Sequence, residues 1–186
     1  ADQTQSVNTI ILSNNNLIGH NTDIAGFTQA IKNLNFDIKG KKIFILGAGG
    51  VVPSIIFALN KMNVAKIIVS NRTKKKAEDL KLLFPNLEFL EWGETIDFDV
   101  IINATSMGLN KETFKLDFSK YGKNKLFYDL IYNPAETSFL KVGKKLGNKT
   151  ENGKLMFIYQ AFEAFKLWHG IEPQINTNTL EIIKND

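Results

Sequence analysis

The 186-residue sequence contains no cysteine and only one arginine, although Lys and Arg together number 23. The lack of cysteine excludes disulfides, zinc–cysteine sites and a thiol nucleophile. No apolar run approaches the ~18 residues of a membrane-spanning helix, and no signal peptide opens the sequence. His20 and His169 are isolated from each other and from clustered acidic residues. We therefore expect a cytoplasmic protein without a membrane segment or a metal site.

The formal net charge of +4 is carried by lysines that are dispersed along the chain. Proteins that read nucleic acids usually rely on arginine and a clustered basic face, so no nucleic-acid partner is expected. Because lysine replaces arginine everywhere else, the retained Arg72 indicates a site that needs a planar, bidentate guanidinium group.

A glycine-rich turn organises the chain. The uncharged apolar run 43–46 passes directly into Gly47-x-Gly49-x-x-Val52, and Pro53 then suits the first turn of a helix. This order is typical of dinucleotide-binding motifs, in which the second glycine lets the backbone approach a pyrophosphate at a helix N-terminus. Val52 departs from the small residue that is usual at the third position. The alternative is a glycine turn in an α/β domain that binds no nucleotide.

After this turn, apolar runs alternate with amphipathic segments. We expect strands at 66–70, 87–90, 99–103, 126–130 and 148–152, and helices at 54–62, 74–84, 137–146 and 153–168. The alternation predicts an α/β fold, a Rossmann-like doubly wound parallel sheet with flanking helices. The apolar and aromatic residues of the last helix, from Leu155 to Trp168, are expected in the core.

The first residues have a different pattern. Segments 7–12 and 17–20 predict a hairpin too small to stand alone, and a helix is expected from Thr22 or Asp23, as its cap, to about Leu34. We expect residues 1–20 to be the remnant of a substrate-binding domain and residues 21–170 to form the nucleotide-binding domain. Residues 171–186 would be a tail that packs back toward the substrate domain.

The end of the second strand of the nucleotide-binding sheet distinguishes NADP from NAD. NAD-binding proteins usually place Asp or Glu there to accept from the ribose 2′-hydroxyl, whereas this chain has Ser70-Asn71-Arg72-Thr73 followed by Lys74–Lys76. A guanidinium, a hydroxyl and amino groups favour binding of a 2′-phosphate. The sequence therefore predicts NADP.

Three further features have local alternatives. Thr105, in the loop 103–108, suits a contact with the nicotinamide ribose, but an ordinary polar loop has the same composition. Asp23 is equally a simple helix cap. Gln160 is equally a polar residue on the solvent side of the last helix.

Taken together, these motifs resemble the shikimate dehydrogenase family. The matching stretches follow the family order over nearly the whole chain: Val7-Asn8-Thr9, Asn21-Thr22-Asp23 with Gly26, Gly47–Val51, Asn71-Arg72-Thr73, Asn103-Ala104-Thr105-Ser106-x-Gly108, Tyr128-Asp129-x-x-Tyr132-x-Pro134-x-x-Thr137, and Asn152-Gly153 with Met156, Gln160-Ala161, Phe165 and Trp168-x-Gly170.

The resemblance implies roles for individual residues. Asp23 would be the carboxylate that partners a catalytic lysine. Substrate contacts would come from Asn8, Tyr132 and Gln160. The residues implied to hold NADP are Gly47, Ala48, Gly49, Gly50 and Val51 at the pyrophosphate, Asn71, Arg72, Thr73 and Lys76 at the 2′-phosphate, and Thr105, Leu130 and Gly153 near the nicotinamide.

The implied reaction is NADPH-dependent reduction of 3-dehydroshikimate to shikimate, a step in chorismate and aromatic amino acid biosynthesis. A Lys–Asp pair would supply a proton and stabilise the developing charge. In the family, the lysine lies upstream of the Val7-Asn8-Thr9 match. We therefore expect this chain alone to bind NADP(H) but to be nearly inactive, since general acid–base catalysis contributes roughly 10²–10⁴-fold.

Two alternatives remain open at this point. One is a dehydrogenase of quinate or another hydroxy acid with a different cofactor preference. The other is a non-catalytic NADP-binding module, or a half-enzyme complemented by a separate N-terminal domain. The expected partners are a small-molecule substrate and either an N-terminal domain outside this sequence or a second copy of the chain.

Overall fold

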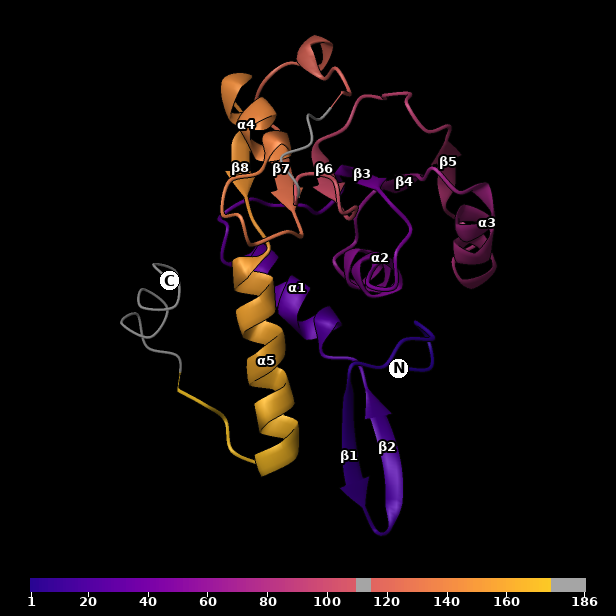
Figure 1. Ribbon diagram of the computed structural model, residues 1–186, viewed down its shortest axis with the longest axis vertical. Helices are drawn as coiled ribbons and strands as arrows, with labels where there is room; N and C mark the ends of the chain where they lie inside the picture. Colours follow the sequence, from indigo (N-terminus) through magenta and orange to yellow (C-terminus); the bar gives the residue numbers. More distant parts are fainter. Residues whose placement is uncertain (110–114, 175–186) are drawn as a thin grey trace.

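A parallel sheet of six strands forms the centre of the fold, in the order β5-β4-β3-β6-β7-β8 (Figure 1). The computed structural model describes residues 1–109 and 115–174. The strands are β3 (Lys42–Leu46), β4 (Lys66–Ser70), β5 (Glu88–Leu90), β6 (Val100–Asn103), β7 (Leu126–Asp129) and β8 (Lys149–Glu151). All neighbouring strands of this sheet run parallel. The predicted Rossmann-like sheet is confirmed.

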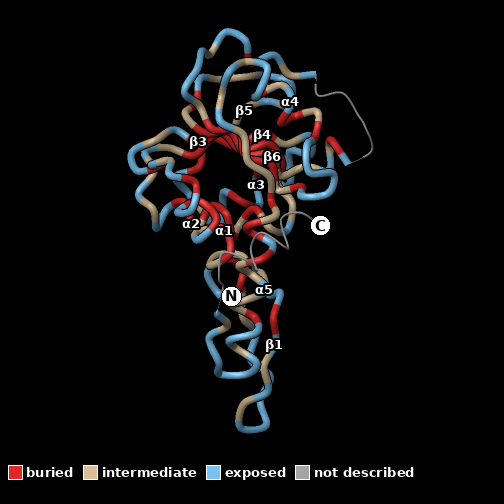
Figure 2. Tube along the Cα trace, turned by 90° about the vertical axis from the view of Figure 1, so that its left-hand side faces the viewer, coloured by how far each residue is buried: buried red, intermediate tan, exposed pale blue. Residues whose placement is uncertain are grey.

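Helices cover both faces of the sheet. They are α1 (Asp23–Lys32), α2 (Val52–Lys61), α3 (Lys74–Leu83), α4 (Ser138–Lys145) and α5 (Lys154–His169), with a short 3₁₀ helix η1 (Ser119–Tyr121) that the sequence analysis did not predict. Helices α1, α2 and α5 lie against one face, and α4 lies on the other (Figure 1). Because the strands are sandwiched between these layers, they appear as the buried centre of Figure 2.

The strand order places a topological switch point between β3 and β6. The chain leaves β3 through α2 to β4 on one side and later returns to β6 on the other. The last residues of the central strands are in register, since Leu46 pairs with both Ser70 and Asn103. Ligands of open α/β sheets bind at such a point, outside the carboxyl ends of the strands.

The predicted hairpin is present and stands apart from the large sheet (Figures 1 and 2). Strands β1 (Thr9–Ser13) and β2 (Asn16–His20) pair antiparallel. Leu12 and Leu17 are 71% and 76% exposed. The hairpin is joined to the end of α5 by a hydrogen bond from Trp168 Nε1 to the Ile10 carbonyl, at 3.0 Å.

One expectation about a helix is wrong. Of the apolar and aromatic residues of α5, Leu155 and Met156 are buried, but Phe157, Phe165 and Trp168 are exposed. The physical reason is that only one side of α5 packs on α1 and the core, while its far end runs beside the hairpin (Figure 1). The predicted cap position is confirmed: Thr22 occupies the N-cap of α1, although its side chain makes no capping hydrogen bond. The predicted tail falls largely on residues 175–186, which lie outside the described residues.

Candidate functional site

The glycine turn follows β3 and is held between its two neighbouring strands. Gly47 has a φ of +108°, and a Cβ there would lie 2.7 Å from the Ala104 carbonyl oxygen, so only glycine fits. Its amide donates to the Ser70 carbonyl at 2.8 Å, and the Ala104 amide donates to the Leu46 carbonyl at 2.8 Å. The turn is therefore fixed at the switch point of the sheet.

The next glycines leave the backbone of the turn open. Among the described residues, and apart from the adjacent residues of the chain, no atom lies within 4 Å of a Cβ built on Gly50, and the nearest atom to one on Gly49 is 3.9 Å away. Val52, the departure from the usual motif, is fully buried in the core formed with α1 and the sheet. Its side chain packs in this core and does not line the cleft at the glycine turn.

A cleft of about 410 Å³ lies at this edge of the sheet. It brings together predicted cofactor residues that come from three separate turns. Within the ranges that the structure describes, no Asp or Glu lines this cleft, and Arg72 and Lys76 bring positive charge to it. Gly50 and Val51 are not among the lining residues. The predicted residues that line it are Gly47, Ala48, Gly49, Asn71, Arg72, Thr73, Lys76 and Thr105.

Asn71 joins two of these turns. Its Oδ1 accepts from the Ala48 amide at 3.1 Å, and its Nδ2 donates to the Thr73 carbonyl at 2.8 Å. The structure therefore gives Asn71 a role in holding the glycine turn against the turn that follows β4. Arg72 and Thr73 are exposed beside it.

Trp92 is a lining residue that the sequence analysis missed. It lies two residues beyond β5, whose last residue Leu90 is in register with Ser70 at the end of β4. It lines both the cleft and the adjoining hollow beside α3, and Arg72 lines the same two spaces. The signal that could have found it is its position just past the carboxyl end of a strand.

A second cluster of polar residues is centred on Thr22, which is 1% exposed. Asn8 Oδ1 accepts from the Thr22 amide at 2.9 Å and from its hydroxyl at 3.1 Å. The Thr22 hydroxyl also lies 3.3 Å from Gln160 Oε1. These contacts bring the start of α1, the hairpin and α5 together, and with them three of the predicted substrate-side residues, Asn8, Asp23 and Gln160.

Asp23 begins α1, where the positive end of the helix dipole favours a carboxylate. Burial raises the pKa of the Asp23 carboxyl above its ordinary value, and a hydrogen bond from the Asn8 side chain partly offsets that rise in pKa. Within the part of the chain that the structure describes, Asp23 forms no salt bridge with a lysine. The carboxylate is thus positioned beside Asn8 but has no cationic partner among these residues.

Gly26 lets α1 and α5 approach closely enough to form this cluster. A Cβ at Gly26 would lie 2.8 Å from both Gln160 Cβ and the Met156 carbonyl oxygen. Real Cβ atoms do not come this close to backbone oxygens, so a larger residue would push α5 and Gln160 away from Thr22.

The remaining predicted residues lie where β7 leads into the following loop. Leu130 donates its amide to the Asn103 carbonyl at 3.0 Å, and a Cβ at Gly153 would lie 2.1 Å from the Leu130 carbonyl oxygen. Tyr132 is 42% exposed and stacks on Phe157 with ring centroids 4.7 Å apart. Leu130, Tyr132 and Gly153 do not line the cleft that contains Arg72.

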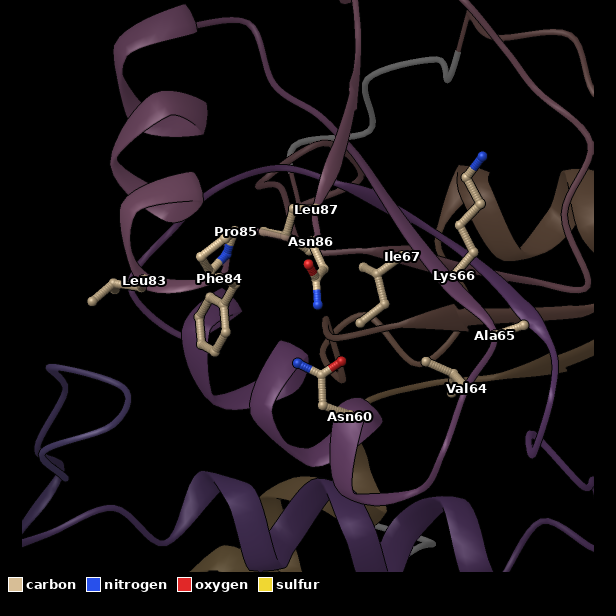
Figure 3. Close-up of a pocket in the computed structure, with 10 residues that line it drawn as sticks. All are labelled: Asn60, Val64, Ala65, Lys66, Ile67, Leu83, Phe84, Pro85, Asn86 and Leu87. Carbon is tan, nitrogen blue, oxygen red and sulfur yellow. The ribbon is translucent and has the colours of Figure 1, made fainter.

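A separate pocket of about 310 Å³ lies at the opposite edge of the sheet, near the start of β4 (Figure 3). Asn60 of α2 and Asn86 point into it from two sides, with Ile67 at its wall (Figure 3). None of the predicted site residues lines it, so it is distinct from the carboxyl-edge site. In the described ranges, no three His, Cys, Asp or Glu side chains gather where they could hold a metal ion, and no helix could span a membrane.

The fold and the open glycine turn define a Rossmann-like protein. Residues 28–131 match the family described as Shikimate / quinate 5-dehydrogenase, and residues 155–177 match the Shikimate 5'-dehydrogenase C-terminal domain. The chain is 53% identical over 184 residues to the NADP(+) shikimate dehydrogenase of Pelagibacter ubique, covering 98% of this chain and 69% of that protein. This chain belongs to the shikimate dehydrogenase family.

Solved structures agree with this assignment. The shikimate dehydrogenase of Aquifex aeolicus superposes with a TM-score of 0.87 at 36% identity, over 100% of this chain and 68% of that one. The enzyme of Thermus thermophilus, solved in complex with NADP(H) and shikimate, superposes with a TM-score of 0.85 at 30% identity, over 99% of this chain and 69% of that one.

Proposed function

We propose that this chain binds NADP(H) at the carboxyl edge of its sheet and serves the NADPH-dependent reduction of 3-dehydroshikimate to shikimate. The observation that carries the cofactor assignment is a cleft that joins the open glycine turn to the single arginine of the chain and that, among the described residues, is lined by no carboxylate. A 2′-phosphate would be repelled by the Asp or Glu of an NAD-type site, whereas a guanidinium binds it bidentately.

The residues present fit NADP. The backbone of Gly49 and Gly50 leaves room for a pyrophosphate at the start of α2, where amide groups and the helix dipole favour an anion. Asn71, Arg72, Thr73 and Lys76 would hold the adenosine 2′-phosphate. NADPH, when bound, supplies the hydride for ketone reduction.

The substrate side is proposed to be the Thr22 cluster with Tyr132. Asn8 and Gln160 carry amide groups suited to the hydroxyls of shikimate, and the hydrogen bonds through Thr22 hold both beside α1. The raised pKa of Asp23 suits a carboxyl group that takes part in proton transfer with a neighbouring general acid. We propose that Asp23 orients a lysine that protonates the developing alkoxide. In the same proposal, residues 1–20 are the remnant of a substrate-binding domain, and residues 21–170 form the NADP-binding domain, which also carries Asp23, Tyr132 and Gln160 to the substrate.

Cofactor binding is the direct test, because it needs only residues that the structure describes. Calorimetric titration of the chain should give much tighter binding of NADPH than of NADH. Arg72→Ala should weaken NADPH binding by about tenfold or more, since charge-assisted hydrogen bonds are worth about 1.5–3 kcal/mol. Its NADH affinity should not change.

Lys75 provides a matched control for this titration. It lies in the same basic run but lines neither the cleft nor the adjoining hollow. Lys75→Ala removes the same charge and should change NADPH affinity by less than about twofold, because exposed charges are screened. An Arg72→Ala chain that binds NADPH as well as the parent would overturn the 2′-phosphate assignment.

The substrate is tested separately with a panel. The matching family covers both shikimate and quinate dehydrogenases. Shikimate, quinate and a simple hydroxy acid are therefore offered with NADP⁺, and their residual rates are compared, since the chain alone is expected to be nearly inactive. Faster turnover of shikimate supports the proposal, and faster turnover of quinate favours the alternative of a quinate dehydrogenase.

A further inference from the structure

A buried carboxylate, Asp129, sits at the carboxyl end of β7 and is 0% exposed. It accepts three hydrogen bonds from the described residues. Asn103 Nδ2 and the Ile131 amide donate to its Oδ1, both at 3.0 Å, and the Thr137 hydroxyl donates to its Oδ2 at 2.5 Å. Because Asn103 and Asp129 are register partners on neighbouring strands, the network crosses directly from β6 to β7.

The same network orders the loop that follows β6. Asn103 Oδ1 accepts from the Thr105 hydroxyl at 2.7 Å, and Thr105 Oγ1 accepts from the Met107 amide at 3.1 Å. Asn103 Nδ2 also donates to the Met107 carbonyl at 3.1 Å. Thr105 therefore turns its hydroxyl toward Asn103 and into its own loop, so Asn103 sets the shape of that loop.

Thr137 extends the network to α4. It is the N-cap of that helix, and its hydroxyl accepts from the Leu140 amide at 3.3 Å. Since the Thr137 hydroxyl oxygen accepts from the Leu140 amide, the hydroxyl hydrogen is donated to Asp129. The donor and acceptor of both hydrogen bonds are thus defined. A Cβ at Gly108, where φ is +111°, would lie 3.0 Å from Thr137 Cβ, so the loop after β6 also packs on this cap.

We propose that Asn103, Asp129 and Thr137 form a positioning cluster that sets the loops 104–108 and 130–132 for the nicotinamide half of NADP(H). This inference rests on the proposed cofactor. The sheet order supports it, because β4 with Arg72 lies on one side of the glycine turn and β6 and β7 lie on the other. A dinucleotide bound across the switch point extends to both sides.

The adenosine half has supports of its own. Asn71 ties the glycine turn to the turn after β4 through backbone groups of Ala48 and Thr73. None of the described hydrogen bonds of Asn71 involves the Asp129 cluster. Loosening the cluster should therefore affect one half of the cofactor site and spare the other, which a general loss of stability would not do.

The test uses two ligands, NADPH and 2′,5′-ADP, which carries the adenosine 2′-phosphate but no nicotinamide. Thr137→Val removes the hydroxyl while keeping the shape of the side chain, and Thr137→Ser keeps the hydroxyl. With Thr137→Val, NADPH binding should weaken by about tenfold, while 2′,5′-ADP binding stays within about twofold. Thr137→Ser should bind NADPH as the unmodified chain does, and Arg72→Ala should weaken the binding of both ligands.

Amide hydrogen exchange of the free chain gives a second readout. In Thr137→Val, or in Asp129→Asn if the first variant does not fold, the amides of Ile131 and Thr105 should exchange faster, and that of Ala48 should not. Equal weakening of the binding of both ligands would overturn the positioning role. So would a variant in which neither the ligand affinities nor the amide exchange rates change. If the unmodified chain binds neither ligand, the proposed cofactor fails first and this inference fails with it. If the unmodified chain binds 2′,5′-ADP but not NADPH, the proposed adenosine site stands and the nicotinamide-side role is refuted.

Discussion

The large sheet and the hairpin carry the two sides of the candidate site, but they hold their residues in different ways. In the sheet, Ile43, Ile45 and their neighbours are fully buried between two layers of helices, and the cleft residues stand at the ends of these strands. In the hairpin, Ile10, Leu12 and Leu17 are exposed, and Asn8 is held mainly through Thr22. The cofactor side is thus supported by a packed core, and the hairpin part of the substrate side by a few polar contacts.

The difference indicates where the site is rigid. A glycine turn between two buried strands cannot move without disrupting the core, because side chains there are close-packed. The hairpin contributes little core and is anchored at its ends, by Thr22 and by the Trp168–Ile10 hydrogen bond. Regions with few buried apolar contacts open at lower free energy than core strands. We therefore expect the substrate side to exchange amide hydrogens faster than the cofactor side.

The largest expected effect contrasts one aliphatic side chain in each region. Ile45→Ala should lower the free energy of unfolding by about 4 kcal/mol, since truncating a buried isoleucine costs about 2–5 kcal/mol. Leu12→Ala, at a side chain 71% exposed, should change it by less than about 0.5 kcal/mol. Urea unfolding of both variants measures the contrast. A loss at Leu12 comparable to that at Ile45 would mean that the hairpin's apolar face is covered in solution.

The second prediction contrasts two carboxylates and concerns pH. Burial raises the pKa of Asp129 from 3.8 to about 6. The folded chain then binds more protons than the unfolded chain between these values, so the Asp129 contribution to stability falls as the pH rises from about 4 to about 6. A shift of about two units corresponds to on the order of 3 kcal/mol.

Asp129→Asn removes this titration, and its stability relative to the unmodified chain should therefore rise over that interval. Unfolding curves at pH 4, 5, 6 and 7 measure the difference, and Asp23→Asn serves for comparison. Burial also raises the pKa of Asp23, while the Asn8 hydrogen bond opposes that rise, so its effect should have the same sign. Parallel curves for Asp129→Asn and the unmodified chain would refute the raised pKa.

The smallest predicted effect compares a glycine from each region. Gly153→Ala would bring a Cβ to 2.1 Å from the Leu130 backbone oxygen, whereas the atoms nearest to a Cβ at Gly19 in the hairpin belong to the exposed Val7 side chain, at 2.8 Å. Backbone cannot give way as a side chain can. Gly153→Ala should therefore lower the free energy of unfolding by about 2 kcal/mol or more, and Gly19→Ala by less than about 1 kcal/mol. Thermal unfolding checks both. Equal costs would show that the hairpin is packed as tightly as the sheet.

Local patterns predicted most of the fold for a definite physical reason. Short apolar runs such as 43–46 and 66–70 are strands buried on both faces, and glycine, proline and capping residues mark where they end. The predicted and observed elements therefore agree closely along the large sheet. The aromatic residues of α5 were misjudged because hydrophobicity alone does not say whether a neighbouring element covers a helix face.

The same limit applies to the candidate site. Gly47 and Arg72 could be singled out because each has a chemical requirement that few residues meet, namely a positive φ and a bidentate fork. Trp92 has no such local signature. Its place in the cleft depends on the register of β5 with β4.

By itself, the sequence determined a parallel nucleotide-fold sheet, its glycine turn and the absence of a carboxylate after β4, because backbone geometry and charge are local properties. Only the tertiary structure decided which polar groups meet. Thr22 lies 138 residues from Gln160 along the chain, and Asn103 lies 26 residues from Asp129, yet each pair is in contact. Such pairs depend on helix packing and strand register, and these are set by the whole core.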